Sequence, residues 1–166
     1  MKKILLICTG GTFNKTYNPL NGNLEIDTKS KALDEISAKW QINFEVASII
    51  GKDSLEVTNS DRLLLLATIN LSKHNDIIVI HGTDTMDLSA EYVADAELDK
   101  RIIFTGAMVP YSIDPVEATA NLSAAFGYLQ ALEKEGVYIS MNGIVASYQE
   151  IKKDRAAGKF VLCESE

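Results

Sequence analysis

The strongest constraint on the fold is a run of four β-branched apolar residues at 77–80, Ile-Ile-Val-Ile, which offers no polar face to water. A strand that is apolar on both faces is typical of the centre of a parallel sheet covered by helices on each side. Similar short runs recur along the chain, separated by segments with helical hydrophobic spacing. This alternation indicates successive βαβ units. The sequence therefore predicts an α/β fold, a doubly wound, mostly parallel, Rossmann-like sheet with helices on both faces.

The predicted elements follow one another without a linker, repeat or low-complexity segment. We place strands at residues 3–8, 44–50, 76–81, 101–105, 137–141 and 143–147, and helices at 29–39, 61–73, 87–96 and 115–135. Asn59 or Ser60 is positioned to cap the second helix, and Pro115 suits the first turn of the fourth. The turn-forming residues at 18–23 predict a mobile loop or a tight hairpin. We expect residues 1–166 to form a single domain, without a second domain.

Composition narrows the classes of function and the compartment. Of the 166 residues, 46% are hydrophobic and 23% are charged, as in soluble globular domains. The formal net charge of −7 disfavours a nucleic-acid partner, which would attract clustered Lys and Arg. The chain has no apolar run of about 18 residues to span a membrane, and its first apolar run is too short for a secretory signal. We therefore expect a cytoplasmic protein that binds neither nucleic acid nor membrane.

The cysteines and histidines carry little functional signal. Cys8 and Cys163 are too few to predict a disulfide framework or a metal cluster, and Cys8 is expected to be a small core residue. His81 is expected to end the third strand rather than to act in catalysis. His74 is predicted to be an isolated surface histidine near a helix end. No metal site is predicted.

Glycine, threonine and acidic residues recur where the predicted strands end. Thr-Gly-Gly-Thr at 9–12 follows the first strand, and Gly-Lys-Asp-Ser at 51–54 follows the second. The third strand leads into His-Gly-Thr-Asp-Thr at 81–85, and the fourth into Thr-Gly-Ala-Met at 105–108. In open α/β sheets, ligands bind outside the carboxyl ends of the strands. We expect these four segments to line one crevice.

Two of these segments carry candidate chemistry. Gly11 allows a sharp turn that leaves Thr12 at a loop tip, where its hydroxyl needs a base or a charged neighbour to act as a nucleophile. The alternative is a plain β-to-α turn. In the second segment, Asp84 is suited to order a substrate amine, and Thr83 to orient a water or attack directly. The alternative there is that Asp84 or Thr85 caps the helix that follows.

The segments at 9–12 and 81–85 resemble the two signatures of the L-asparaginase (asparaginase/glutaminase) family. The segment at 105–108 with Pro110 is similar to the family's fourth-strand segment, and Asn121 and Leu122 match a pair in its next helix. The resemblance extends from residue 2 to about residue 160. It implies an amidohydrolase that converts a small side-chain amide, most often L-asparagine, to the acid and ammonia, with no cofactor and no metal.

The resemblance implies two catalytic sets, each centred on a threonine. In the first, Thr12 matches the nucleophile, and Tyr17 is the loop tyrosine, although it lies closer to Thr12 than the family tyrosine does. The second set joins Thr83 and Asp84 to a lysine. Alignment of the strand that ends at residues 141–142 puts that lysine at Lys153. Without the alignment, Lys152 and Lys153 indicate a solvated charge pair.

The same alignment gives several further positions. For substrate binding, the backbone amides of Gly11 and Gly82 suit an oxyanion. The family's serine, polar residue and aspartate match residues 51–53, so the carboxylate-binding serine hydroxyl is absent here. Lys52 is expected to bind the carboxylate by charge instead, while Asp53 keeps the aspartate position. Residues matched to the family's substrate-binding segments are Gly11, Lys52, Asp53, Gly82 and Ala107.

Three functions are compatible with this pattern. The leading interpretation is an asparaginase-like hydrolase, because a binding protein does not need both threonines, the acid and the lysine. The alternatives are a non-catalytic amino-acid-binding or regulatory module, and an ammonia-producing subunit of an amidotransferase. The resemblance implies assembly as a homodimer or homotetramer, with a second domain of a neighbouring subunit closing the crevice. A lone domain is therefore expected to self-associate and to turn over free asparagine weakly.

Overall fold

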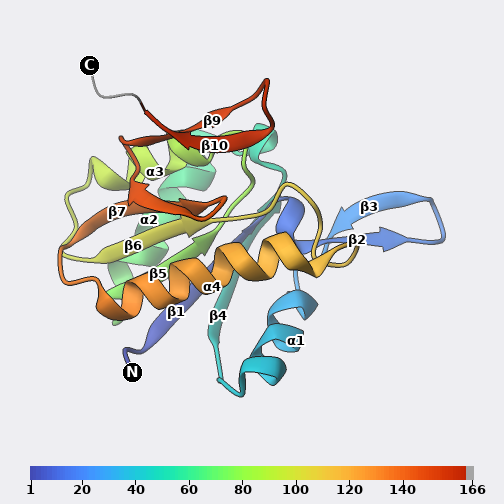
Figure 1. The fold of residues 1–166 in the computed structure, drawn as a ribbon, viewed down its shortest axis with the longest axis horizontal. Coiled ribbons are helices and arrows are strands. Elements are labelled where there is room, and N and C mark those ends of the chain that lie inside the picture. The colour runs from blue at the N-terminus through green and yellow to red at the C-terminus, as the bar shows by residue number, and fades with distance from the viewer. Residues whose placement is uncertain (164–166) are drawn as a thin grey trace.

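Six strands form one sheet in the order β4-β1-β5-β6-β7-β8 in the structure, a computed structural model that describes residues 1–163. Adjacent strands are parallel except for β8, which runs antiparallel to β7 at one edge. This arrangement confirms the predicted mostly parallel sheet (Figure 1). The strands are β1 (Ile4–Gly10), β4 (Glu45–Lys52), β5 (Asp76–Ile80), β6 (Arg101–Thr105), β7 (Gly136–Met141) and β8 (Ile144–Ser147).

Helices cover both faces of the sheet, as predicted. The helices α1 (Lys31–Trp40) and α4 (Pro115–Ala131) pack on one face, and α2 (Asn59–Leu71) and α3 (Met86–Ala94) pack on the other. Along the described residues, no helix combines the length and the apolar character needed to cross a membrane. The fold is therefore a three-layer α/β arrangement, with one apolar core on each side of the sheet.

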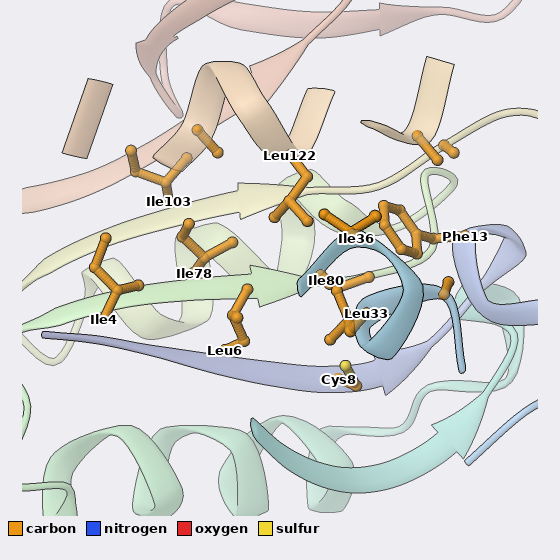
Figure 2. Packing of buried hydrophobic residues seen from close by; sticks show 14 of the residues in the cluster. Ile4, Leu6, Cys8, Phe13, Leu33, Ile36, Ile78, Ile80, Ile103 and Leu122 are labelled. Atoms are coloured by element: carbon orange, nitrogen blue, oxygen red, sulfur yellow. The ribbon is translucent and has the colours of Figure 1, made fainter. Parts of the chain in front are cut away.

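The apolar run at 77–80 explains why both faces are covered. Ile78 and Ile80 point into the core beneath α1 and α4, where Figure 2 shows them beside Leu33 and Leu122. The alternate residues of the same strand enter the core beneath α2 and α3. Every side chain of this strand segment is fully buried. Burying one aliphatic side chain stabilises the folded state by about 1.5–3 kcal/mol relative to leaving it exposed to water. This strand has aliphatic side chains on both faces, so helices must cover both faces to gain that free energy.

Two short hairpins lie outside the main sheet. β2 (Lys15–Asn18) and β3 (Asn23–Ile26) form the first, which projects away from the body of the domain and confirms the tight-hairpin alternative (Figure 1). β9 (Ile151–Asp154) and β10 (Lys159–Leu162) form the second. The sequence did not predict the second hairpin, because its strands are short and its first strand is largely charged. Ile151 and Phe160 fix it to the core on the α2 and α3 side.

The cap of α2 differs from the prediction. Thr58, rather than Asn59 or Ser60, precedes the helix, and its hydroxyl accepts a hydrogen bond from the Asp61 amide at 3.2 Å. The Asp61 carboxylate in turn accepts the Thr58 amide at 2.8 Å. This reciprocal capping box satisfies two amides at once, which is why the helix already begins at Asn59, one of the two residues predicted to cap it.

His74 is buried, so the prediction of a surface histidine was wrong. Only 6% of His74 is exposed, and its Nε2 lies 3.1 Å from the Glu45 carboxylate. The connection from α2 to β5 folds against the start of β4 and encloses the ring. Cys8, by contrast, is a buried core residue as predicted.

The order of the strands indicates where a ligand binds. From β1 the chain crosses to β4 on one side, whereas the later strands β6 and β7 follow on the other side of β5. The carboxyl ends of β1 and β5 therefore flank the point at which the winding reverses. Ligands of doubly wound sheets bind in the crevice at this switch point.

Candidate active site

Close approach of glycines brings the four strand-end segments together. Gly11 has φ +80°, and a Cβ atom on it would lie 2.5 Å from the backbone nitrogen of Gly82. A Cβ on Gly82 would lie 2.7 Å from that of Ser54, and one on Gly106 would lie 2.4 Å from the His81 carbonyl oxygen. Real Cβ atoms do not approach backbone this closely. The segments after β1, β4, β5 and β6 thus meet in one place, as predicted.

Lys153 joins Thr83 and Asp84, as expected from the alignment. Its ammonium lies 2.9 Å from Thr83 Oγ1 and 2.8 Å from Asp84 Oδ1. Thr83 is buried, and its hydroxyl donates to the Met108 sulfur at 3.3 Å. Lys152, the neighbour of Lys153 on β9, is exposed. The two lysines are therefore not a solvated pair, since one of them lies against a buried hydroxyl and a carboxylate.

Arg155 is a fourth member of this cluster that the sequence did not reveal. Its Nη1 donates to Asp84 Oδ1 at 2.9 Å, and its Nη2 donates to the Asp84 carbonyl at 2.8 Å. Both cations bind the same carboxylate oxygen, so among the residues the structure covers, Asp84 Oδ2 has no partner. The only sequence signal was an arginine two positions after Lys153, and the unpredicted β9–β10 hairpin is what brings it to the site.

The two cations hold Asp84 in its ionised form. The pKa of Asp84 is lowered, chiefly by the hydrogen bond from Lys153 and further by Arg155, while partial burial opposes the shift. A carboxylate with a lowered pKa and one free oxygen is suited to bind an ammonium group. Two positive side chains face one negative one, so the cluster carries a net positive charge.

Thr12 begins the short helix η1 (Thr12–Asn14) at the tip of the first turn and is half-buried. Within residues 1–163, its hydroxyl makes no hydrogen bond. The Gly11 amide donates to the Lys52 carbonyl at 3.0 Å, so this donor is already engaged. The Gly82 and Thr83 amides have no acceptor in the described part of the chain. Both are backbone donors at this edge that remain available to an oxyanion.

Tyr17 lies on β2, away from the other candidates. It is 61% exposed, and its cross-strand partner is Leu24 on the projecting hairpin. No hydrogen bond joins its hydroxyl to Thr12 in the described structure. The geometry thus brings Thr12, Thr83, Asp84 and Lys153 to one edge of the sheet and leaves Tyr17 outside the cluster.

The charges of Lys52 and Asp53 are compensated within the chain. The Lys52 ammonium binds the Asp61 carboxylate at 2.8 Å, and this hydrogen bond is the main reason that the pKa of Asp61 falls to about 2. Asp53 pairs with Lys15 at 2.8 Å. Both groups are therefore engaged on the rim of the crevice.

Contrary to expectation, a serine hydroxyl is present in the crevice. Ser54, at the start of η2 (Ser54–Glu56), is buried, and its Oγ accepts the Asp84 amide at 3.1 Å. The Ser54 carbonyl accepts the Thr85 hydroxyl at 2.7 Å, so Thr85 does not cap α3 with its side chain. Ala107 is buried in the core beneath α1 and α4, so its side chain does not face the crevice.

His81 has a structural rather than a catalytic environment, in agreement with the prediction. The ring is fully buried, and its Nδ1 donates to the Gly82 carbonyl at 2.8 Å. Burial, more than any other cause, lowers the pKa of His81 to about 4. The imidazole is therefore neutral near pH 7 and stabilises the turn that carries Thr83.

This pKa predicts an acid-sensitive stability. Below its ordinary pKa of 6.5, His81 gains a proton in the unfolded chain but stays neutral in the folded one until about pH 4. Stability is thus fully present above pH 6.5 and lost as the pH falls toward 4, by about 3 kcal/mol. Urea unfolding at pH 7 and at pH 4 measures how much the free energy of unfolding decreases between the two. We expect this decrease to be about 3 kcal/mol larger in the parent chain than in His81→Gln. Equal losses in the two proteins would assign the acid sensitivity to other groups.

The model of the family described as "Asparaginase, N-terminal" matches residues 3–159, and thus nearly all of the sequence. The chain belongs to the asparaginase family. Its sequence is 26% identical to the glutaminase-asparaginase of Acinetobacter glutaminasificans over 163 residues, which cover 90% of this chain and 49% of that protein. It is 24% identical to L-asparaginase 2 of Bacillus subtilis over 165 residues, 92% of this chain and 44% of that protein.

Solved structures of the asparaginase family share the fold. The thermostable L-asparaginase from Thermococcus kodakarensis superposes with a TM-score of 0.80 and 19% identity, over all of this chain and 52% of that one. A probable cytoplasmic L-asparaginase from Campylobacter jejuni also superposes with a TM-score of 0.80, with 21% identity, over 96% of this chain and 52% of that one. The chain therefore spans about half the length of the asparaginases that it matches.

Proposed function

We propose that this chain carries the hydrolytic site of an asparaginase-like enzyme, which converts the side-chain amide of a small amino acid to the acid and ammonia. L-Asparagine is the proposed substrate. The observation that carries the proposal is the contact of Lys153 with both Thr83 and Asp84 at the switch point of the sheet. A lysine beside a buried hydroxyl and a carboxylate is the kind of cluster in which proton transfer is tuned.

The proposed reaction proceeds in two steps. In the first, the Thr12 hydroxyl attacks the amide carbon, its proton passes to the leaving nitrogen, and ammonia departs to leave an acyl ester on Thr12. In the second, a water positioned by Thr83 attacks the ester, releases the acid and restores the Thr12 hydroxyl. The net reaction consumes one water and needs no metal or cofactor.

Charges and donors at the strand ends support this reaction. A substrate ammonium is bound by Asp84 Oδ2, while Lys153 stays close to Thr83 to accept or return a proton. The unengaged amides of Gly82 and Thr83 stabilise the negative charge that develops on the carbonyl oxygen. Loss of one such donor from an oxyanion site costs on the order of 3 kcal/mol of barrier.

Assembly and location belong to the same proposal. We expect a cytoplasmic homodimer or homotetramer in which Tyr17 moves to the site when a neighbouring subunit covers the projecting hairpin. Leu63 and Leu64 on α2 are half exposed and offer apolar surface for such contacts, whereas Ile69, Leu122 and Leu129 are used in the core. A crevice that stays open to water loses much of the advantage of its oriented donors.

A release assay tests the reaction directly. The purified chain is incubated with L-asparagine, D-asparagine, L-glutamine and short acyl amides, and ammonia is measured together with self-association by sedimentation. We expect release from L-asparagine first, because its amide is short enough to reach Thr12 while Asp84 holds the ammonium. Ammonia from none of these amides would refute the hydrolase.

A second function, an amino-acid-binding module, is favoured by the position of Tyr17. Its hydroxyl lies on an exposed hairpin outside the cluster, so the first catalytic set is incomplete in this arrangement. Saturable binding of L-asparagine without ammonia release, in the same samples, would support the binding module in place of the hydrolase.

A further inference from the structure

Arg155 lies on the rim of the crevice and does not use all of its N–H groups in contacts with Asp84. Its side chain is 63% exposed, and it uses two N–H groups on Asp84, one to the carboxylate and one to the carbonyl. A guanidinium has five N–H groups, and within residues 1–163 the others have no partner, which leaves them available to a ligand. The turn that carries Arg155 is ordered, because Asp154 Oδ1 accepts the amides of both Ala156 and Ala157 at 3.0 Å.

The neighbouring cations are less suited to bind a ligand carboxylate. Lys153 is 13% exposed and is directed to Thr83 and Asp84. Lys52 is bound by both oxygens of the Asp61 carboxylate, and Lys15 is bound by Asp53. Among the cations of the site in residues 1–163, Arg155 is therefore the most exposed to solvent.

The position of Arg155 beside Asp84 matches the shape of an α-amino acid. The ammonium and the carboxylate of such a molecule are attached to one carbon atom. An ammonium on the free Asp84 Oδ2 therefore keeps its α-carboxylate within a few ångströms of the same carboxyl group, on the order of two covalent bonds away. The guanidinium that already holds Asp84 Oδ1 is planar and can bind a carboxylate through two parallel hydrogen bonds.

We propose that Arg155 is a specificity-determining residue that binds the α-carboxylate of the ligand whose ammonium is held by Asp84. The crevice then selects free α-amino acids over peptides and over amides whose α-carboxylate is blocked. This inference rests on the proposed function for the reaction, but the selection itself operates at the binding step. Lys153 is left in contact with Thr83, where it accepts or returns a proton.

Calorimetric binding of two non-hydrolysed ligands tests the selection. L-Aspartate, the expected product, and its α-amide differ only in the α-carboxylate. We expect the parent chain to bind L-aspartate about tenfold more tightly, a ratio typical of one charged hydrogen-bonded pair. Arg155→Ala should bind the two ligands equally. Arg155→Lys should restore part of the preference, because it keeps the charge but loses the planar fork.

The matched control is Lys152→Ala, which removes one positive charge from the adjacent strand β9 without touching the cluster. It should keep the full preference, and circular dichroism should show all variants folded. The inference is overturned if the parent chain binds both ligands equally or binds neither. It is also overturned if Arg155→Ala weakens both ligands by the same factor, since Arg155 would then act only by holding Asp84.

The binding result separates this inference from the proposed reaction. A chain that releases no ammonia but keeps an Arg155-dependent preference for L-aspartate supports the selection and refutes the hydrolase. A chain that hydrolyses L-asparagine and its α-amide derivative L-asparaginamide with the same KM, in the parent and in Arg155→Ala alike, supports the hydrolase and refutes the selection.

Discussion

Thr12→Ala and Thr83→Ala should each abolish ammonia release while the chain stays folded. Thr12 lies at the tip of the first turn, where its hydroxyl has no partner in residues 1–163, and the Thr83 hydroxyl accepts the Lys153 ammonium at 2.9 Å. Removing the Thr12 hydroxyl prevents the acyl ester from forming, and removing the Thr83 hydroxyl leaves the ester without the group that positions its water. We expect kcat to fall roughly 10³-fold or more in each variant, as for other nucleophile deletions.

Mass spectrometry of the trapped intermediate distinguishes the two threonines. Rapid acid quenching during turnover should leave an aspartyl ester on the peptide that contains Thr12, and Thr83→Ala should increase its amount because the second step is slowed. Thr12→Ser should keep measurable activity, since the hydroxyl remains. If Thr12→Ala kept more than about a tenth of kcat, a loss of less than roughly 1.4 kcal/mol of barrier, Thr12 would not be the nucleophile. The same result for Thr83→Ala would exclude Thr83 as the group that positions the water.

The central part of the fold follows from local patterns in the sequence. The strand at 101–105 was predicted with the bounds observed for β6, and α4 begins at Pro115 as its fixed backbone angle suggests. The predicted helix overshoots the end of α4 at Ala131, because the polar residues beyond it still have good helix propensity. These elements are specified by their own residues, so no knowledge of their neighbours was needed.

Features that depend on distant residues could not be predicted in this way. His74 looks like a surface residue until β4 places Glu45 beside it, and Ser54 looks like a loop residue until the Asp84 amide reaches it. Arg155 belongs to the same class. Its position depends on the β9–β10 hairpin, whose strands pair a charged segment with an apolar one and have no periodicity of their own.

The position of Lys153 shows what a family resemblance adds. By sequence pattern alone, Lys152 and Lys153 form an exposed pair, and neither is distinguished as a ligand of Asp84. Alignment of the preceding strand selects Lys153, and the structure shows this lysine in contact with both Thr83 and Asp84. In a β-strand, neighbouring side chains point to opposite faces, so a shift of one residue would have reversed the two roles.

Replacing Lys153 with methionine should lower kcat by about 10²–10⁴-fold, the usual contribution of a positioned acid or base. Methionine keeps much of the length and apolar stem of lysine but cannot carry a proton or donate to Thr83 Oγ1. Asp84 would keep only Arg155 as a partner, so its pKa should rise toward its ordinary value as the hydrogen bond from Lys153 is lost. The chain should fold, because Arg155 still compensates the carboxylate.

The pH dependence of kcat separates a proton-transfer role from a merely electrostatic one. If Lys153 moves a proton to or from Thr83, one limb of the profile should disappear in Lys153→Met, and Lys153→Arg should not restore it, because arginine stays protonated. If Lys153 only supplies charge, Lys153→Arg should recover most of the rate with the profile unchanged. Lys152→Met, on the opposite face of the same strand, should behave as the parent chain. Near-parent turnover in Lys153→Met would remove this lysine from the mechanism and leave Thr83 without its base.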